Sequence, residues 1–152
     1  MNILVCVKRV PLTGGKIVLT DDERAISTRH LGFTVSPHEE CGAEEAVRLI
    51  EQHGGSSAVL TLGPPEAEEQ LRDMMALGID RAVHLVTDGE EWDPQATAQA
   101  IVDSIQNQPD PPDLILFGNE LVVEYLGSRY PVTVQTIDST PVFDPDNARV
   151  RA

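Results

Sequence analysis

The chain has 152 residues, of which 41% are hydrophobic and 24% charged, and its formal net charge is −14. A chain of this length can bury about 68–70% of its unfolded surface, so the composition predicts a globular domain and excludes a disordered chain. The negative charge argues against nucleic acid and against an anionic membrane as partners, because both are bound through clustered Lys and Arg. Nineteen acidic and only three basic residues lie in residues 36–128. We interpret the acidic residues as lying on the solvated faces of helices.

The cysteines and the N-terminal sequence indicate a cytoplasmic protein. Cys6 lies in an apolar run, where a reduced and buried thiol is expected, and two cysteines are too few for a disulfide framework. The first nine residues place their apolar side chains before their charges, which is not the order of a secretory signal. No apolar run approaches the ~20 residues that span a bilayer, so we expect no membrane insertion.

Four short apolar runs have the character of buried parallel strands. Such strands are covered on both faces and are therefore apolar at consecutive positions. The runs are residues 3–7, 58–62, 82–86 and 114–117.

Three amphipathic segments between these runs are predicted helices, because their apolar residues recur at helical spacing. They are residues 43–50, 67–75 and 98–105. Ser36-Pro37 with Glu39 predicts a capped start for the first helix, and Asp93-Pro94 opens the third. Gly54 and Gly78 are placed to end the first two helices.

The alternation of strands and helices predicts an α/β fold, with a doubly wound, mostly parallel and Rossmann-like sheet. We expect residues 1–128 to form one nucleotide-binding-type α/β domain. Residues 10–35 interrupt the alternation and predict a loop with a short strand or hairpin. Three prolines interrupt residues 129–152, which we expect to form an extended C-terminal tail or an edge strand.

A ligand site is expected where the strand order reverses, beyond the carboxyl ends of the strands. That edge includes Cys6 to Arg9, Leu62-Gly63-Pro64 and Gly118-Asn119. A glycine directly after a strand lets a ligand approach the backbone, although a simple turn explains either glycine equally well.

The familiar catalytic motifs are absent from the sequence. Gly14-Gly15-Lys16 lacks the earlier glycine and the hydroxyl of a P-loop, and no Gly-x-Gly-x-x-Gly or Gly-x-Ser-x-Gly occurs. The four histidines have no metal-ligand spacing on a helix. The sequence therefore nominates no catalytic nucleophile or general base, and an enzyme with its own turnover is the least favoured interpretation.

Taken together, several segments resemble the beta subunit of electron-transfer flavoproteins. They are residues 1–11, residues 36–40 and 44–49 around the first helix, Leu62-Gly63-Pro64, residues 75–82 and residues 113–118. Each segment alone is modest, but their order and spacing are specific.

The resemblance implies an adenine nucleotide alpha hydrolase-like fold that binds a structural AMP. It also implies a heterodimer with an alpha subunit that holds most of the FAD, and electron transfer from acyl-CoA or related dehydrogenases. By matching positions, the AMP site would comprise residues after three strands and at the start of the first helix: Cys6, Val7, Lys8, Ser36, Pro37, His38, Glu39, Leu62, Gly63, Gly118, Asn119 and Glu120. Backbone amides at the helix start and after Gly118 would bind phosphate, while Cys6 and Leu62 would pack against the base.

Two alternatives remain open at this point. Gly118 with Gly127-Ser128 faintly resembles the phosphate loop of universal stress proteins, which would make the chain a regulatory module that binds ATP or AMP. The other alternative is a shortened paralogue without redox activity. The family pattern after Gly118 is Lys-Gln, whereas this chain has Asn119-Glu120, and it also ends before the family's usual end.

Overall fold

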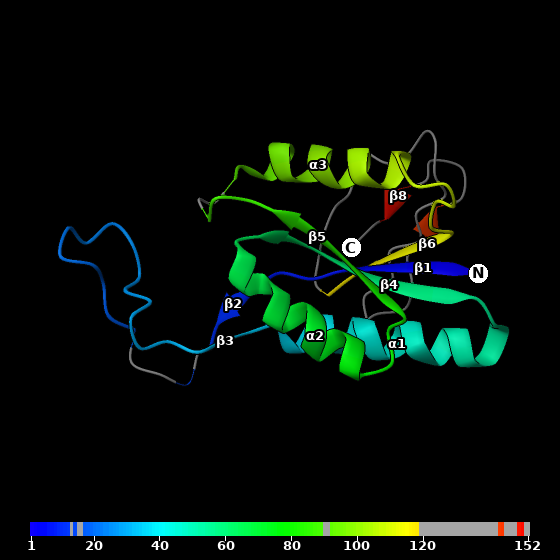
Figure 1. Cartoon of the computed structure of the whole chain (residues 1–152), viewed down its shortest axis with the longest axis horizontal. Helices are drawn as coiled ribbons and strands as arrows, with labels where there is room; N and C mark the ends of the chain where they lie inside the picture. The colour runs from blue at the N-terminus through cyan, green and yellow to red at the C-terminus, as the bar shows by residue number, and fades with distance from the viewer. Residues whose placement is uncertain (13, 15–16, 90–91, 119–142, 145–148, 151–152) are drawn as a thin grey trace.

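The centre of the molecule is a four-stranded, fully parallel sheet (Figure 1). The computed structural model describes residues 1–12, 14, 17–89, 92–118, 143–144 and 149–150. The strands stand in the order β5 (Arg81–Val86), β4 (Ser56–Gly63), β1 (Asn2–Cys6) and β6 (Leu114–Phe117). All four predicted strands are confirmed, and the observed sheet is the predicted α/β arrangement.

Helices cover both faces of this sheet. Figure 1 shows α1 (Pro37–His53) and α2 (Glu68–Ala76) on one side and α3 (Pro94–Gln106) on the other. The 3₁₀ turn η1 (Pro65–Ala67) leads into α2, because the two prolines after β4 fix an extended entry. The three predicted helices are thus confirmed, and the fold is doubly wound.

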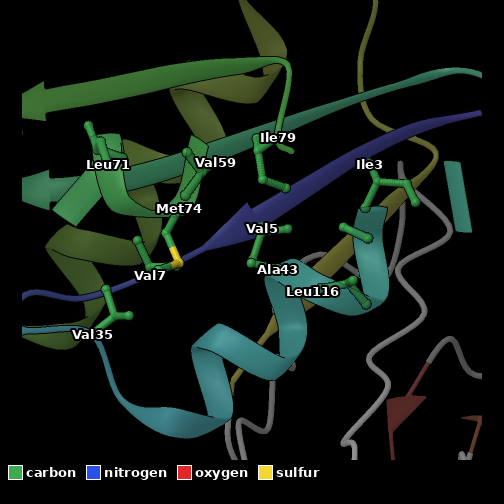
Figure 2. Packing of buried hydrophobic residues seen from close by; sticks show 11 residues of the cluster. Ile3, Val5, Val7, Val35, Ala43, Val59, Leu71, Met74, Ile79 and Leu116 are labelled. Carbon is green, nitrogen blue, oxygen red and sulfur yellow. The ribbon is translucent and has the colours of Figure 1, made fainter. Parts of the chain in front are cut away.

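The core consists of two apolar clusters, one on each face, which follow from the alternation of side chains along each strand. On the side of α1 and α2, Ile3, Val5 and Val7 pack against Ala43, Leu71 and Met74 (Figure 2). On the other side, Leu4 and Cys6 pack with Leu60, Val102, Ile105 and Ile115. Continuous burial along β1 explains why that strand is apolar at every central position.

The predicted helix ends are also confirmed. Ser36 is the N-cap of α1 in a complete capping box with Glu39, and the Asp93 carboxylate caps α3 through the amides of Gln95 and Ala96. Gly54 and Gly78 both have positive φ angles, which glycine adopts without steric cost.

An extended arm (residues 17–32) projects from the carboxyl edge of the sheet (Figure 1). It lies between β2 (Val10–Pro11) and β3 (Phe33–Thr34), which pair with each other in antiparallel orientation. Within the arm, Leu19 and Ile26 form an antiparallel bridge. The hairpin expected in residues 10–35 is therefore present.

The expected C-terminal tail, residues 129–152, is described by the structure only at residues 143–144 and 149–150. β7 (Phe143–Asp144) and β8 (Arg149–Val150) pair with each other in antiparallel orientation. The expected boundary between residues 128 and 129 lies outside the described residues. Among the described helices, none is long and apolar enough to span a membrane.

Candidate functional site at the carboxyl edge of the sheet

The strand order reverses at β1, and this reversal defines the candidate site. From β1 the chain moves outward to β4 and then β5, and it returns through α3 to place β6 on the opposite side of β1. The carboxyl ends of β1 and β6 therefore lie side by side, with Cys6 directly opposite Phe117. This is the position in open α/β sheets where ligands bind.

Apolar side chains line this edge on the face covered by α3. Cys6 is buried, and Leu62, Leu85 and Phe117 are half-buried. Leu62 lies two positions after Leu60 on β4, so it shares the face of Cys6 and Phe117. We call Cys6, Leu62, Leu85 and Phe117 the apolar floor.

The start of α1 faces the same edge and is organised around the Glu39 carboxylate. One carboxylate oxygen accepts a hydrogen bond from the Lys8 amide at 3.0 Å, and the other accepts from the Ser36 amide at 3.0 Å. The Ser36 hydroxyl in turn accepts from the Glu39 amide at 3.3 Å. Glu39 thus ties the end of β1 to the start of α1.

This arrangement changes how the helix start can receive a ligand. Pro37 has no N–H and the Glu39 N–H is already bonded to Ser36, so the first turn of α1 offers a ligand only the His38 N–H. The helix end favours negative charge, and the Glu39 carboxylate already supplies it. The amides expected to bind phosphate at this helix are therefore largely occupied from within the chain.

Burial raises the pKa of Glu39 above its ordinary value of 4.5, because the surroundings disfavour the charged form. The hydrogen bonds from Ser36 and Lys8 lower the pKa of this carboxyl but do not offset its burial. Burial likewise raises the pKa of the Cys6 thiol to about 12, and the nearby Glu39 carboxylate acts in the same direction. Cys6 is therefore a packing residue and not a reactive thiolate.

The two glycines of the predicted site have different structural roles. A Cβ atom on Gly118 would lie within 3.0 Å of the backbone of Glu39, so the missing side chain makes room for α1. A Cβ on Gly63 would meet Ala67 at 3.5 Å, which is ordinary contact. Gly118 is therefore required for packing at the site, whereas the space around Gly63 would admit alanine.

The remaining predicted site residues lie around this edge or outside the described part of the chain. Three of them, Lys8, Pro37 and His38, are exposed, whereas Val7 is buried in the core cluster on the side of α1 and α2. The buried Thr61 hydroxyl donates to the Val7 carbonyl at 2.8 Å and fixes the end of β1 against β4. Asn119 and Glu120 lie outside the described residues.

A second feature of the same edge was not predicted from the sequence. A cleft of about 700 Å³ separates the base of the arm from η1 and α2, with Arg9, Phe33, Glu66 and Glu69 among its lining residues. The Arg9 guanidinium lies 3.3 Å from the centroid of the Phe33 ring, a cation–π contact that joins the segment between β1 and β2 to β3. The sequence contains only a weak signal for this contact, because Arg9 is simply a basic residue after the first strand and Phe33 is one of three phenylalanines.

Gln70 holds this second region to the domain. Its side chain is buried on α2, and its amide group donates to the Phe33 carbonyl at 3.4 Å. The structure contains no group of three metal-ligating side chains among its described residues.

The parallel sheet, with helices on both faces and strand order reversing at β1, defines a Rossmann-like, doubly wound α/β fold. Residues 25–136 match the family described as "Electron transfer flavoprotein domain", which covers α1 through β6. The chain belongs to the electron transfer flavoprotein family and is of the beta-subunit type.

Individual relatives agree with this assignment. The electron transfer flavoprotein subunit beta of Bacillus subtilis is 33% identical over 140 residues, which is 91% of this chain and 53% of the relative. Protein FixA of Azorhizobium caulinodans is 33% identical over 127 residues, 80% of this chain and 44% of the relative. The acryloyl-CoA reductase electron transfer subunit gamma of Anaerotignum propionicum is 36% identical over 83 residues, 55% of this chain and 31% of the relative. The chain thus spans about half the length, or less, of these curated relatives.

Proposed function

We propose that this chain acts as a beta-type electron-transfer subunit that binds AMP at the carboxyl edge and pairs with a flavin-carrying alpha subunit. In this role the heterodimer accepts electrons from acyl-CoA or related dehydrogenases and passes them on. The family match over residues 25–136 carries the proposal, because it includes both the start of α1 and the end of β6.

The described residues fit the base of AMP better than its phosphate. We expect the adenine ring to lie against the apolar floor, whereas the start of α1 offers a ligand only the His38 N–H. A phosphate next to the Glu39 carboxylate would meet negative charge in a half-buried setting, which is unfavourable. We therefore place the base near Cys6 and Leu62 and the phosphate away from Glu39.

FAD enters this proposal through the alpha subunit. When bound there, the flavin supplies the electron-carrying chemistry, and the protein supplies binding and orientation. The contribution of the present chain is a rigid α/β domain that orders the alpha subunit around its cofactor.

The nucleotide is tested by denaturing the purified protein and identifying any released small molecule by mass spectrometry. We expect AMP at close to one molecule per chain. Leu62→Glu adds a carboxylate to the apolar floor and should abolish the AMP, whereas Leu77→Glu, at an exposed position after α2, should retain it. Release of ATP would instead favour a regulatory module like the universal stress proteins. Absence of any nucleotide would refute AMP binding.

The flavin partner is tested separately by co-expression with an alpha subunit of the same family. We expect the two chains to co-purify with a visible flavin absorption spectrum. An alpha subunit that folds with flavin but does not associate with this chain would contradict the electron-transfer role.

A further inference from the structure

The Glu39 carboxylate is fixed at the point where the first turn of α1 would otherwise receive an anion. Its two oxygens accept hydrogen bonds from the Lys8 and Ser36 amides, both at 3.0 Å. The backbone of Glu39 also packs so closely against Gly118 that a Cβ atom there would collide with it. A ligand could displace this carboxylate only by breaking both hydrogen bonds, so the negative charge is a permanent part of the site.

Few other ionisable groups face Glu39 from the elements packed against it. At the end of β1, the Lys8 charge favours the ionised carboxyl, and the Cys6 thiol is neutral because burial raises its pKa to about 12. β4 and the described end of β6 carry no ionisable side chain. On α1 itself, the neighbours His38 and Glu40 are both exposed. Lys8 is therefore the one cation that acts on Glu39 from these described elements.

Burial gives the charge of Glu39 more weight than the charges around it. Glu39 is half-buried, whereas Lys8 and Glu40 are exposed. Water and salt screen exposed charges strongly and buried charges much less. Burial also raises the pKa of Glu39 above its ordinary value of 4.5, so its charge is lost at a higher pH than that of an ordinary glutamate. The charge state of Glu39 thus controls the electrostatics at the start of α1.

Adenine nucleotides share one base and differ in the negative charge of their phosphates. Each further phosphate adds negative charge, so a fixed carboxylate repels ADP and ATP more strongly than AMP. We infer that Glu39 determines the nucleotide specificity of the site through its charge, admitting the monophosphate and rejecting ADP and ATP. This inference rests on the proposed function and deepens it, because it assigns the choice between nucleotides to one side chain.

Competition binding with the full chain tests this assignment. Equilibrium dialysis against labelled AMP, with unlabelled AMP, ADP or ATP as competitor, measures the three relative affinities. We expect the wild type to bind AMP about tenfold more tightly than ADP, the ratio for one further unit charge about 10 Å from Glu39 at a protein-like dielectric. In Glu39→Gln, which keeps the shape of the side chain without its charge, this preference should largely disappear.

Glu40→Gln is the matched control. It removes the same charge from the next residue of the same helical turn, where the side chain is exposed. Because solvent screens that charge, Glu40→Gln should keep the wild-type preference for AMP. Thermal melts of both variants check that the domain remains folded.

A pH profile separates the charge of Glu39 from any structural role. As the pH falls from about 8 to about 5, Glu39 takes up a proton and its repulsion is lost, since its pKa is raised. The wild-type preference for AMP over ADP should therefore shrink over this range, whereas Glu39→Gln should give a flat profile. His38 and Glu40 are present in both proteins, so their titration cancels in the comparison. The wild-type profile decides the question alone if the variant does not fold.

The outcomes distinguish this inference from the proposed function. If the wild type binds AMP but its preference is unchanged in Glu39→Gln, or does not change with pH, the role of Glu39 is wrong while the proposed function stands. If the wild type binds no adenine nucleotide, or prefers ATP, the proposed AMP site and the role of Glu39 fail together.

Discussion

Gly118 and Glu39 are packed backbone against backbone, where the end of β6 meets the first turn of α1. The approach is so close that a Cβ atom at position 118 would lie within 3.0 Å of the Glu39 amide nitrogen and Cα. Gly118 therefore determines how near α1 lies to the sheet, and Glu39 connects the same turn to the end of β1.

Gly118→Ala should destabilise the protein, because either β6 or α1 must move to admit the methyl group. Overpacking of this kind costs about 1–3 kcal/mol in the free energy of unfolding, measurable by urea denaturation. Gly14→Ala is the control, since a Cβ atom at Gly14 would meet nothing within 4 Å. Equal stabilities of the two variants would show that the backbone contact is not tight in solution.

Glu39→Gln tests the burial of the Glu39 carboxyl through pH dependence. Because the folded-state pKa of Glu39 is raised, its contribution to stability is fully present below the ordinary pKa of 4.5 and is lost as pH rises through the raised pKa. We therefore expect the stability of the wild type relative to Glu39→Gln to fall as pH rises from about 4 towards neutrality. Chemical denaturation at a series of pH values measures this difference.

Glu45→Gln provides a control of opposite sign. Hydrogen bonds from Arg48 lower the pKa of Glu45, so its contribution is present above 4.5 and is lost as pH falls through the lowered pKa. The stability of the wild type relative to Glu45→Gln should therefore rise with pH. Parallel pH profiles for the two variants would contradict the assigned burial of Glu39.

The two cysteines should differ sharply in reactivity. At pH 8 the Cys6 thiol stays protonated, because burial raises its pKa to about 12. Cys41 is exposed on α1. With a disulfide reagent, we expect one thiol per folded chain to react quickly and a second only after denaturation. Rapid modification of Cys6 in the folded protein, located by peptide mass spectrometry, would refute this prediction.

Asp80→Ala should destabilise the connection between α2 and β5. One Asp80 carboxylate oxygen accepts from the Ser57 amide at 2.7 Å and from the Ser57 hydroxyl at 3.2 Å. Since Ser57 is buried, removing the acceptor leaves its donors unpaired, at a cost of about 1–3 kcal/mol in the free energy of unfolding.

Two companion variants make the Asp80 test specific. Asp103→Ala removes a carboxylate that accepts from the exposed Gln99 side chain, and it should change stability by less than about 0.5 kcal/mol. In the double variant Ser57→Ala, Asp80→Ala, the two effects should be less than additive, because both residues share the same hydrogen bonds. Strict additivity would mean that the Asp80 effect arises elsewhere.

The sheet and its helices could be predicted because their signals are local. The continuous apolar run of β1 reflects burial on both faces, and the Ser36-to-Glu39 spacing predicts a capping box that the structure contains. The position of the candidate site followed from the strand alternation, since the reversal of strand order places Cys6 beside Phe117. The resemblance to the beta subunit is confirmed by the family match together with the relatives named as beta subunits.

The internal chemistry of the site could not be predicted, because it depends on contacts between residues far apart in sequence. Nothing in the sequence shows that the Lys8 amide bonds the Glu39 carboxylate, and this contact is what occupies the helix end. The role of Gly118 is likewise visible only once α1 is placed against it. Arg9 and Phe33 meet across the ribbon of β2 and β3, whose register the sequence pattern does not specify.

The central position of β1 also affects how the chain folds during synthesis. The Asn2 amide bonds the Asp113 carboxylate 111 residues further along, and β6 completes the second edge of β1. At about 5–20 residues per second, a ribosome takes about 6–22 s to make the intervening chain. During that interval the first strand, apolar on both faces, has an unpaired edge, which makes the nascent protein susceptible to aggregation until β6 emerges.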